Sequence, residues 1–469
     1  MSEVTIALNR FGLGARFDQA LVPDPRRWLT EQLDRFDPRP APLTETATST
    51  TVAIGLAAYF AEQRQQRRAS TGVATAPDPA MADARRLFRQ QGQEQYGTAV
   101  AARMGAALTT PTPFAERLVH FWANHFAVSA DKQTVVGLAP TLEFEAIRPH
   151  LLGRFGDMLT AVERHPAMLL YLDQAQSAGP GSPLGLRAAA RGVNRVGLNE
   201  NLAREIMELH TLGVGSGYTQ ADVTEFARAL TGWTVAGLGQ GAAARFADGR
   251  PGAFLFAPPL HEPGERTIMG KRYAQAGDAQ AQAVLDALAI HPATARHLAT
   301  KLARHFAGDV PPPALVARLE RAFLSSGGDL RTVYRALIAA PEAWTPSSVK
   351  FRTPWEWSVA SLRALGYREV PGPAMVGLLA QLGQPAWRPG SPAGYDDIAA
   401  SWAGPDAVLR RVEAAERLAS RAGPVDARAL GEALFPGALS PATAQGVARA
   451  DSPGQALALL LVSPEMMRR

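Results

Sequence analysis

The side chains with the clearest capacity for chemistry lie in PTPFAERLVHFWANHFAVSADK, residues 111–132. At about 100° per residue of an α-helix, Glu116, His120 and Asn124 share one polar stripe. His125 points about 140° away from His120, so these two histidines cannot chelate one ion as an i, i+4 pair does. Polar groups among large aromatic neighbours are costly to bury unless they find partners. The segment therefore predicts either histidines hydrogen-bonded in the core or polar groups that line a pocket.

A second helix, NENLAREIMELHTLG at residues 199–213, carries a pair of carboxylates. Glu205 and Glu208 lie within about 60° of each other on a helical wheel. Carboxylates paired in this way recur as metal ligands in helical bundles. Arg204 can instead pair with Glu200 and Glu208, each four residues away. A metal-binding face and a solvated charged face are therefore both open.

A third helix is expected in YTQADVTEFARALTGW, residues 218–233. Thr219 and Asp222 fit a variant capping box, in which each side chain bonds to the backbone of the other residue. We favour this capping role for Asp222 and keep a role in a site as the alternative.

Together these residues suggest a metal centre between helices. The predicted metal ligands are His120, His125, Glu205, Glu208 and His261. Asn124 is the predicted catalytic residue, which would orient a substrate or a ligating histidine. A mixed shell of carboxylate and imidazole suits a divalent transition metal such as iron, manganese or zinc. We expect the His120/Asn124 stripe and the Glu205/Glu208 face to meet across one polar pocket.

The elements that must position these groups are mainly helical. Apolar residues recur at i, i+3 and i+4 along most of the chain. Short apolar segments bounded by Gly and Pro, AFLFAPP and ERTIMGKRY, predict a small β-hairpin excursion at about 235–275. The fold class is therefore mainly α, a large multi-helix domain with a small β excursion. We expect a main domain over residues 1–370 and a C-terminal helical subdomain, 371–469, packed on it.

Four segments rich in Pro, Gly, Ser, Thr or Ala are predicted to be loops. They are residues 37–51, 69–80, 174–197 and 383–394. Loops as long as 174–197 are often functional.

Composition excludes several classes of protein. The 469 residues include no cysteine, which excludes disulfides, iron–sulfur clusters and a cysteine nucleophile. The net charge of +5 is a weak field over this length, and no basic stripe interleaved with aromatic residues occurs, so we expect no nucleic-acid partner. Only four lysines occur, at positions 132, 271, 301 and 350. No apolar stretch of about 18 residues and no secretory signal are found, so we expect no membrane span and a cytoplasmic location, or export alongside a partner that carries a signal.

Familiar catalytic motifs are absent from the sequence. GERTIMGKR at 264–272 has the wrong spacing for a Walker A loop, and Arg272 replaces the residue that would hold magnesium. HEPGE at 261–265 is not the H-E-x-x-H motif, and neither a G-x-S-x-G elbow nor a Rossmann fingerprint occurs.

Long motifs spread over nearly the whole chain carry a family resemblance. They are ALNRFGLG, ERLVHFWANHF, YLDQ, NENLAREIMELHTLGVGSGYTQADVTEFARALTGW, HEPGERTIMGKRY, HPATARHLATKLARHF, KFRTPWEW and LGQPAWRPGSPAGY. The chain resembles the bacterial domain-of-unknown-function 1800 family. It departs from the family at Glu262, where Asp is common, and at RPGSPAGY, where the family has an Asn-Val-x-Gly-Trp run.

This resemblance implies a predominantly helical protein and assigns no activity. It also implies a partner, because family members are often encoded beside a second family that looks similar to sulfatases and alkaline phosphatases. Two hypotheses follow. The first is a metal-dependent enzyme, hydrolytic or oxidative; the second is a non-catalytic binding or assembly partner of an exported phosphatase- or sulfatase-like protein. Whether the protein is an enzyme stays open at this point.

Overall fold

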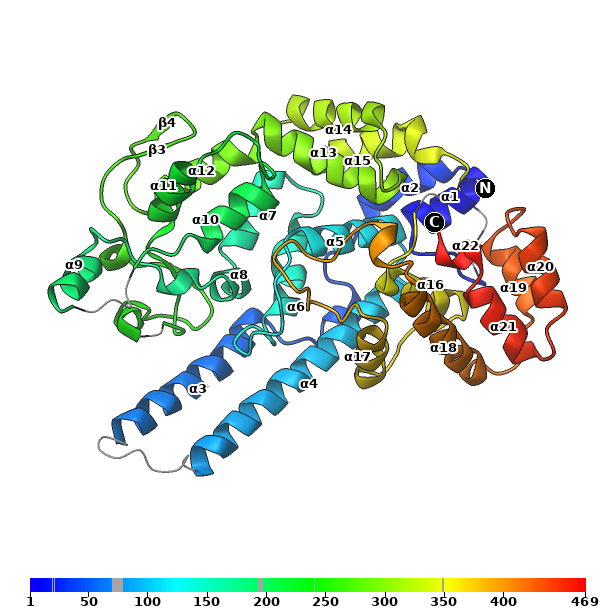
Figure 1. The fold of residues 1–469 in the computed structure, drawn as a ribbon, viewed down its shortest axis with the longest axis horizontal. Helices are drawn as coiled ribbons and strands as arrows, with labels where there is room; N and C mark the ends of the chain where they lie inside the picture. The colour runs from blue at the N-terminus through cyan, green and yellow to red at the C-terminus, as the bar shows by residue number, and fades with distance from the viewer. Residues whose placement is uncertain (19, 21, 70–78, 193–196, 240, 348–349) are drawn as a thin grey trace.

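The structure is a computed structural model that describes residues 1–18, 20, 22–69, 79–192, 197–239, 241–347 and 350–469. Helices dominate the described chain, and its β structure consists of two small two-stranded sheets (Figure 1). The prediction of a mainly α fold is confirmed.

The N-terminal third contains two long helices that leave the body of the molecule. The first elements are α1 (Glu3–Ile6), a π-helical turn (Ala7–Phe11), α2 (Pro25–Arg35), α3 (Ser49–Ala69), α4 (Pro79–Thr109) and α5 (Pro113–His125). α3 and α4 lie side by side and project together away from the other helices (Figure 1). α5 begins at Pro113, directly after Thr112, and proline suits the first helical position because it has no backbone N–H that would lack a partner there.

The middle third folds into shorter helices. They are α6 (Ala139–Thr141), a π-helix (Leu142–Ile147), α7 (Phe155–Glu163), α8 (Pro166–Tyr171), α9 (Pro183–Ala190), α10 (Asn201–Glu205), a π-helix (Ile206–His210) and α11 (Gln220–Leu230). The predicted loop at 174–197 is wrong in part, because α9 lies inside it. The Ser182 hydroxyl accepts a hydrogen bond from the Gly185 amide and caps this helix. This cap outweighs the low helix propensity of the surrounding glycines. Residues 193–196 of that loop lie outside the described chain.

The β excursion lies where the sequence predicts it. β1 (Trp233–Val235) pairs antiparallel with β2 (Phe254–Phe256), with Trp233 opposite Phe256. β3 (Arg266–Ile268) and β4 (Lys271–Tyr273) form a second hairpin. Asp222 joins this hairpin to α11: it completes the predicted capping box with Thr219 and also accepts the Met269 amide at 2.6 Å. The capping role of Asp222 is confirmed.

The last part of the chain returns to helices, most of which begin at proline. They are α12 (Asp278–Ala289), α13 (Pro292–Ala307), α14 (Pro313–Ser325), α15 (Leu330–Ala339), α16 (Pro354–Ala364), α17 (Gly372–Gln381), α18 (Pro405–Arg421), α19 (Ala427–Leu434), α20 (Pro441–Ala448), α21 (Pro453–Leu461) and α22 (Pro464–Met467). Residues 383–394 form no helix or strand, as predicted. Of the predicted loop at 69–80, residues 70–78 lie outside the described chain.

Two hydrophobic clusters form most of the core. The larger one joins α5, α13 and the helices of the middle of the chain. The second joins α18–α22 to Leu8 and Trp357, so the two ends of the sequence share one packed cluster. The division at residue 370 stays a prediction. Within the described ranges, no helix combines the length and the apolar character needed to cross a membrane.

Candidate functional site

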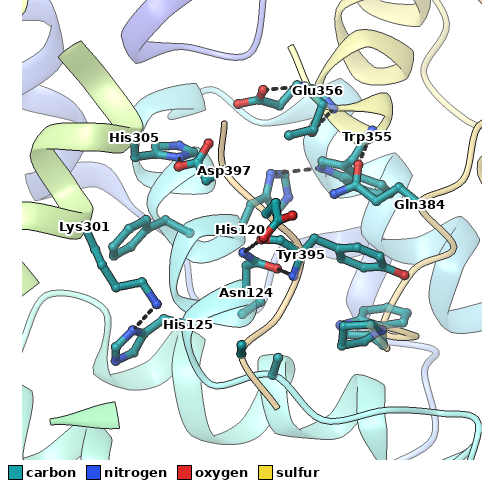
Figure 2. A pocket seen from close by; sticks show the side chains of 18 of the residues that line it. His120, Asn124, His125, Lys301, His305, Trp355, Glu356, Gln384, Tyr395 and Asp397 are labelled. Carbon is teal, nitrogen blue, oxygen red and sulfur yellow. Dashed lines mark hydrogen bonds and ion pairs between the residues drawn. The ribbon is translucent and has the colours of Figure 1, made fainter. Parts of the chain in front are cut away.

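A cavity of about 320 Å³ lies among three parts of the chain that are far apart in sequence. α5, α13 and the segment 384–397 form most of its wall, and the start of α16 completes it (Figure 2). Its polar lining includes His120, Asn124, His125, His297, Lys301, Arg304, His305, Glu356, Gln384, Tyr395, Asp396 and Asp397. Three of the six predicted site residues, His120, Asn124 and His125, therefore line one cavity.

Asn124 holds the segment that closes this cavity. Its Nδ2 donates to the Tyr395 carbonyl at 2.8 Å, and its Oδ1 accepts the Tyr395 amide at 2.7 Å. Gly394, at φ +81°, lies so close that an added Cβ would meet the Asn124 carbonyl oxygen at 2.3 Å. Both polar ends of the Asn124 side chain are thus used by the backbone. Asn124 orients the chain at Tyr395, whereas the sequence predicted that it orients a substrate or a ligating histidine.

His120 is held by structural partners. Its Nδ1 accepts the Trp355 indole N–H at 3.2 Å, and its Nε2 lies 3.7 Å from Glu116. Glu116 is already bound by both terminal nitrogens of the buried Arg148, at 2.7 and 2.9 Å. Burial, with the charges of nearby arginines, holds the pKa of His120 well below its usual value. His120 is therefore neutral at physiological pH and carries its proton on Nε2.

The contact in the cavity that is best suited to proton transfer joins His125 and Lys301. The Lys301 Nζ lies 2.9 Å from His125 Nδ1, and the two side chains point toward each other from α13 and α5 (Figure 2). His125 Nε2 lies 3.1 Å from the His210 carbonyl oxygen, which can only accept. The proton of the neutral imidazole is therefore on Nε2, and Nδ1 is the acceptor for Lys301.

The helix that was predicted to supply carboxylates supplies carbonyls to this region. Its second half, Ile206–His210, is π-helical and ends at the cavity. His125 donates to the His210 carbonyl, and His297 donates to the Leu209 carbonyl at 3.1 Å. Because the last carbonyls of a helix have no partner within it, histidines from α5 and α13 satisfy them.

Burial changes the acidity of these groups. It lowers the pKa of Lys301 to about 8, with a smaller lowering by Arg304 that Asp397 opposes. It also lowers the pKa of His297 to about 4, helped by the charge of Lys301. His125 has its pKa held well below the usual value by burial and then by Lys301. A lysine with a pKa of about 8 thus lies beside imidazoles that are neutral at physiological pH.

A second imidazole of the cavity is oriented by a carboxylate. His305 Nδ1 lies 2.8 Å from Asp397 Oδ2, while the buried His305 Nε2 has no hydrogen-bond partner in the described chain. Although burial raises the pKa of Asp397, the hydrogen bond from His305 and the charges of Lys350 and Arg469 hold it below its usual value. Lys350 contacts the same carboxylate at 3.1 Å.

Glu356 has a structural role in the wall of the cavity. Its carboxylate contacts Arg117 and lies 2.7 Å from Arg469, and it completes a capping box with Thr353 at the start of α16. Burial raises the pKa of Glu356, but Arg469 and Arg117 outweigh it and hold the pKa well below its usual value. Glu356 is a neutralised carboxylate rather than a free acid.

Glu205 and Glu208 do not line the cavity. Glu208 pairs with Arg204 at 3.3 Å, and Arg204 also pairs with Glu200 at 3.2 Å. Glu205 is half-buried, and burial raises its pKa. The predicted pocket shared by the Glu205/Glu208 face and the His120/Asn124 stripe is therefore not formed. One physical reason is Arg204, which pairs with Glu208 four residues further along the chain.

His261 lies in the β excursion and does not line the cavity either. Its Nδ1 donates to the Thr231 carbonyl at 2.9 Å, and its ring packs edge-on against Phe256. Among the described residues, no three His, Asp or Glu side chains come together in a way that could hold a metal ion. The structure does not assemble the predicted ligand set. His125, in particular, has both ring nitrogens engaged by protein partners.

Sequence reasoning missed Lys301, His305 and Asp397. A signal for the first two was present, because His297, Lys301 and His305 recur every fourth residue and so share one face of α13. No comparable signal marked Asp397, which reaches the cavity only through the irregular path of residues 384–397.

Comparisons with known proteins were made for the whole chain. A family model described as "Protein of unknown function (DUF1800)" matches residues 6–468. Neither a curated protein nor a solved structure matches the chain.

Proposed function

The chain belongs to the DUF1800 family, and we propose that it is an enzyme that acts on a small molecule held in the cavity between α5 and α13. The observation that carries this proposal is the Lys301–His125 contact, an amine beside a neutral imidazole in a cavity. The volume of about 320 Å³ is at the lower end of the range for small-molecule sites.

Lys301 and His305 are the groups we assign to proton transfer. General acid–base catalysis works best when the pKa of the group lies near the working pH, and burial brings the pKa of Lys301 to about 8. His305 is oriented by Asp397 through Nδ1, which leaves Nε2 to accept a proton from a ligand. Perturbed groups that gather in a cleft favour a functional site over a structural one.

The test measures whether the protein converts any compound in a mixture of cellular small molecules, so no substrate has to be known in advance. Wild-type protein and Lys301→Met protein are incubated with a small-molecule extract of bacterial cells, and the extract is compared by mass spectrometry. Methionine keeps most of the side-chain volume and removes the amine. Lys271→Met is the matched control, because Lys271 lies on β4 with its ammonium over Tyr273, outside the cavity.

We expect wild-type and Lys271→Met protein to consume the same compound and Lys301→Met protein to leave it unchanged. An extract that wild-type protein does not change would overturn the proposal. A parallel arm with a chelator tests the metal-dependent hydrolytic or oxidative form of the proposal. Turnover that stops with the chelator and returns with iron, manganese or zinc would support that form.

The second candidate is a binding or assembly partner of an exported phosphatase- or sulfatase-like protein. The observation in its favour is the α3–α4 hairpin, which projects from the body as an arm would (Figure 1). In this form the protein is cytoplasmic or leaves the cell with the partner that carries a signal. Cell fractionation with and without the partner decides: export that needs the partner supports this candidate, and unchanged location without it contradicts it.

A further inference from the structure

We propose that Lys301 is a nucleophile that forms an imine with an aldehyde or ketone group of the ligand in the cavity. This inference deepens the proposed function and rests on it, because it assigns a substrate class to the same site. It stands on the hydrogen-bond geometry of Lys301 and on the contrast with the other lysines.

The lone pair of the Lys301 amine is free to attack. His125 gives its only proton to the His210 carbonyl, so its Nδ1 can accept from Lys301 but cannot donate to it. The contact therefore uses an N–H of the amine and leaves the nitrogen lone pair uncapped. A partner that donates a proton, such as a hydroxyl group, could instead have occupied the lone pair with a hydrogen bond.

The other lysines lack this combination. Lys132 pairs with Asp173 at 2.7 Å and donates to two carbonyls, and Lys350 pairs with both Asp309 and Asp397. Lys271 lies exposed on β4. Within the described ranges, Lys301 alone among the four combines a place in the cavity wall with no carboxylate oxygen within 4 Å of Nζ.

Titratable side chains from three parts of the chain line the cavity with Lys301. α5 presents the neutral His125, α13 presents His297, Arg304 and His305, and the segment 384–397 presents Asp396 and Asp397. Burial lowers the pKa of the amine most, Arg304 lowers it further, and Asp397 opposes both. With the pKa at about 8, roughly a tenth of the amine is neutral at pH 7.

The reaction balances without an oxidant or reductant. The nitrogen lone pair attacks the carbonyl carbon, the C–N bond forms, and the carbonyl oxygen takes up a proton. The nitrogen gives up one proton to balance the one taken up, which leaves a carbinolamine. The carbinolamine hydroxyl group then takes up a second proton and leaves as water, and the nitrogen loses its second proton as the C=N bond forms. His305, one turn further along α13, has Nε2 available to accept and return this proton.

The experiment traps the imine on the full chain. The protein is treated at pH 7 with glyoxylate or acetaldehyde in the presence of sodium cyanoborohydride, which reduces an imine to a stable amine. Peptide mapping then gives the rate of modification at each lysine. We expect Lys301 to react about 100-fold faster than the exposed Lys271, because burial lowers the pKa of Lys301 to about 8 and so leaves more of its amine neutral at pH 7.

Two variants and two readouts keep the outcomes distinct. Lys301→Arg keeps the positive charge and should lose the fast modification, whereas Lys271→Arg should keep it. Modification of Lys301 at the same rate as Lys271 would overturn the inference. If turnover of the cell extract depends on Lys301 while no imine is trapped, the inference falls and the proposed enzyme stands. If the imine is trapped and no compound is turned over, the nucleophile stands and the enzyme falls.

Discussion

At the scale of single residues, the carboxylates of the cavity have cationic or hydrogen-bonding partners, whereas its lysine has no carboxylate partner. Glu356 is held by two arginines, whereas Asp397 is shared between His305 and Lys350. Lys301 is left with a neutral imidazole. Since an unpaired buried charge is costly, this lysine gives up its proton more easily than an exposed lysine does.

Asp397→Asn tests this balance. The pKa of Asp397 is depressed, so its ionised form stabilises the fold above about pH 4 and this stabilisation is lost as the pH falls through the folded-state pKa. We expect the variant to lower the free energy of unfolding by about 2 kcal/mol at pH 7, since hydrogen bonds to charged groups contribute this much. The difference between variant and wild type should shrink below about pH 4.

Urea unfolding across this pH range measures the effect. Asp396→Asn is the matched control, because Asp396 is the exposed neighbour and its hydrogen bond from Ser401 survives in the amide. Equal effects of the two substitutions at pH 7, or a difference that grows in acid, would contradict the role assigned to Asp397.

At the scale of elements, the sequence predicted the starts of helices better than the faces they present. The Thr219/Asp222 capping box marks the start of α11, because this signal acts within four residues. A threonine followed by proline also stands at the starts of α5 and α16. The helical wheel for residues 199–213 was less useful. It assumes 3.6 residues per turn, and the second half of that segment is a π-helix.

Asp222→Ala tests the element-scale account. Loss of the capping partner and of the bond to the Met269 amide should lower the free energy of unfolding by about 0.5–2 kcal/mol. Turnover and imine trapping should be unchanged, because α11 does not line the cavity. Thermal unfolding monitored by circular dichroism gives the first result; a loss of turnover with unchanged stability would mean that Asp222 acts in the site.

At the scale of the whole molecule, the cavity exists only because distant segments meet. Asn124 on α5 binds the backbone at Tyr395, more than 250 residues away, and Tyr96 on α4 donates to the Ala386 carbonyl at 2.6 Å. Periodicity and capping carry no information about such contacts. The mainly α fold and the β excursion were therefore predictable, and so were three polar residues that line the cavity, whereas their partners from α13 and from 384–397 were not.

Burial in this assembled cavity lowers the pKa of Lys301 to about 8, and NMR titration of the side-chain nitrogens or adjacent carbons in lysine-labelled protein tests this most directly. With only four lysines in the chain, each signal is assignable by a single Lys→Arg substitution. We predict that the Lys301 signal titrates with a midpoint near pH 8, that the signal is absent in Lys301→Arg, and that urea moves its midpoint to about 10.4. A Lys301 signal that titrates near 10.4 in the folded protein would contradict the account.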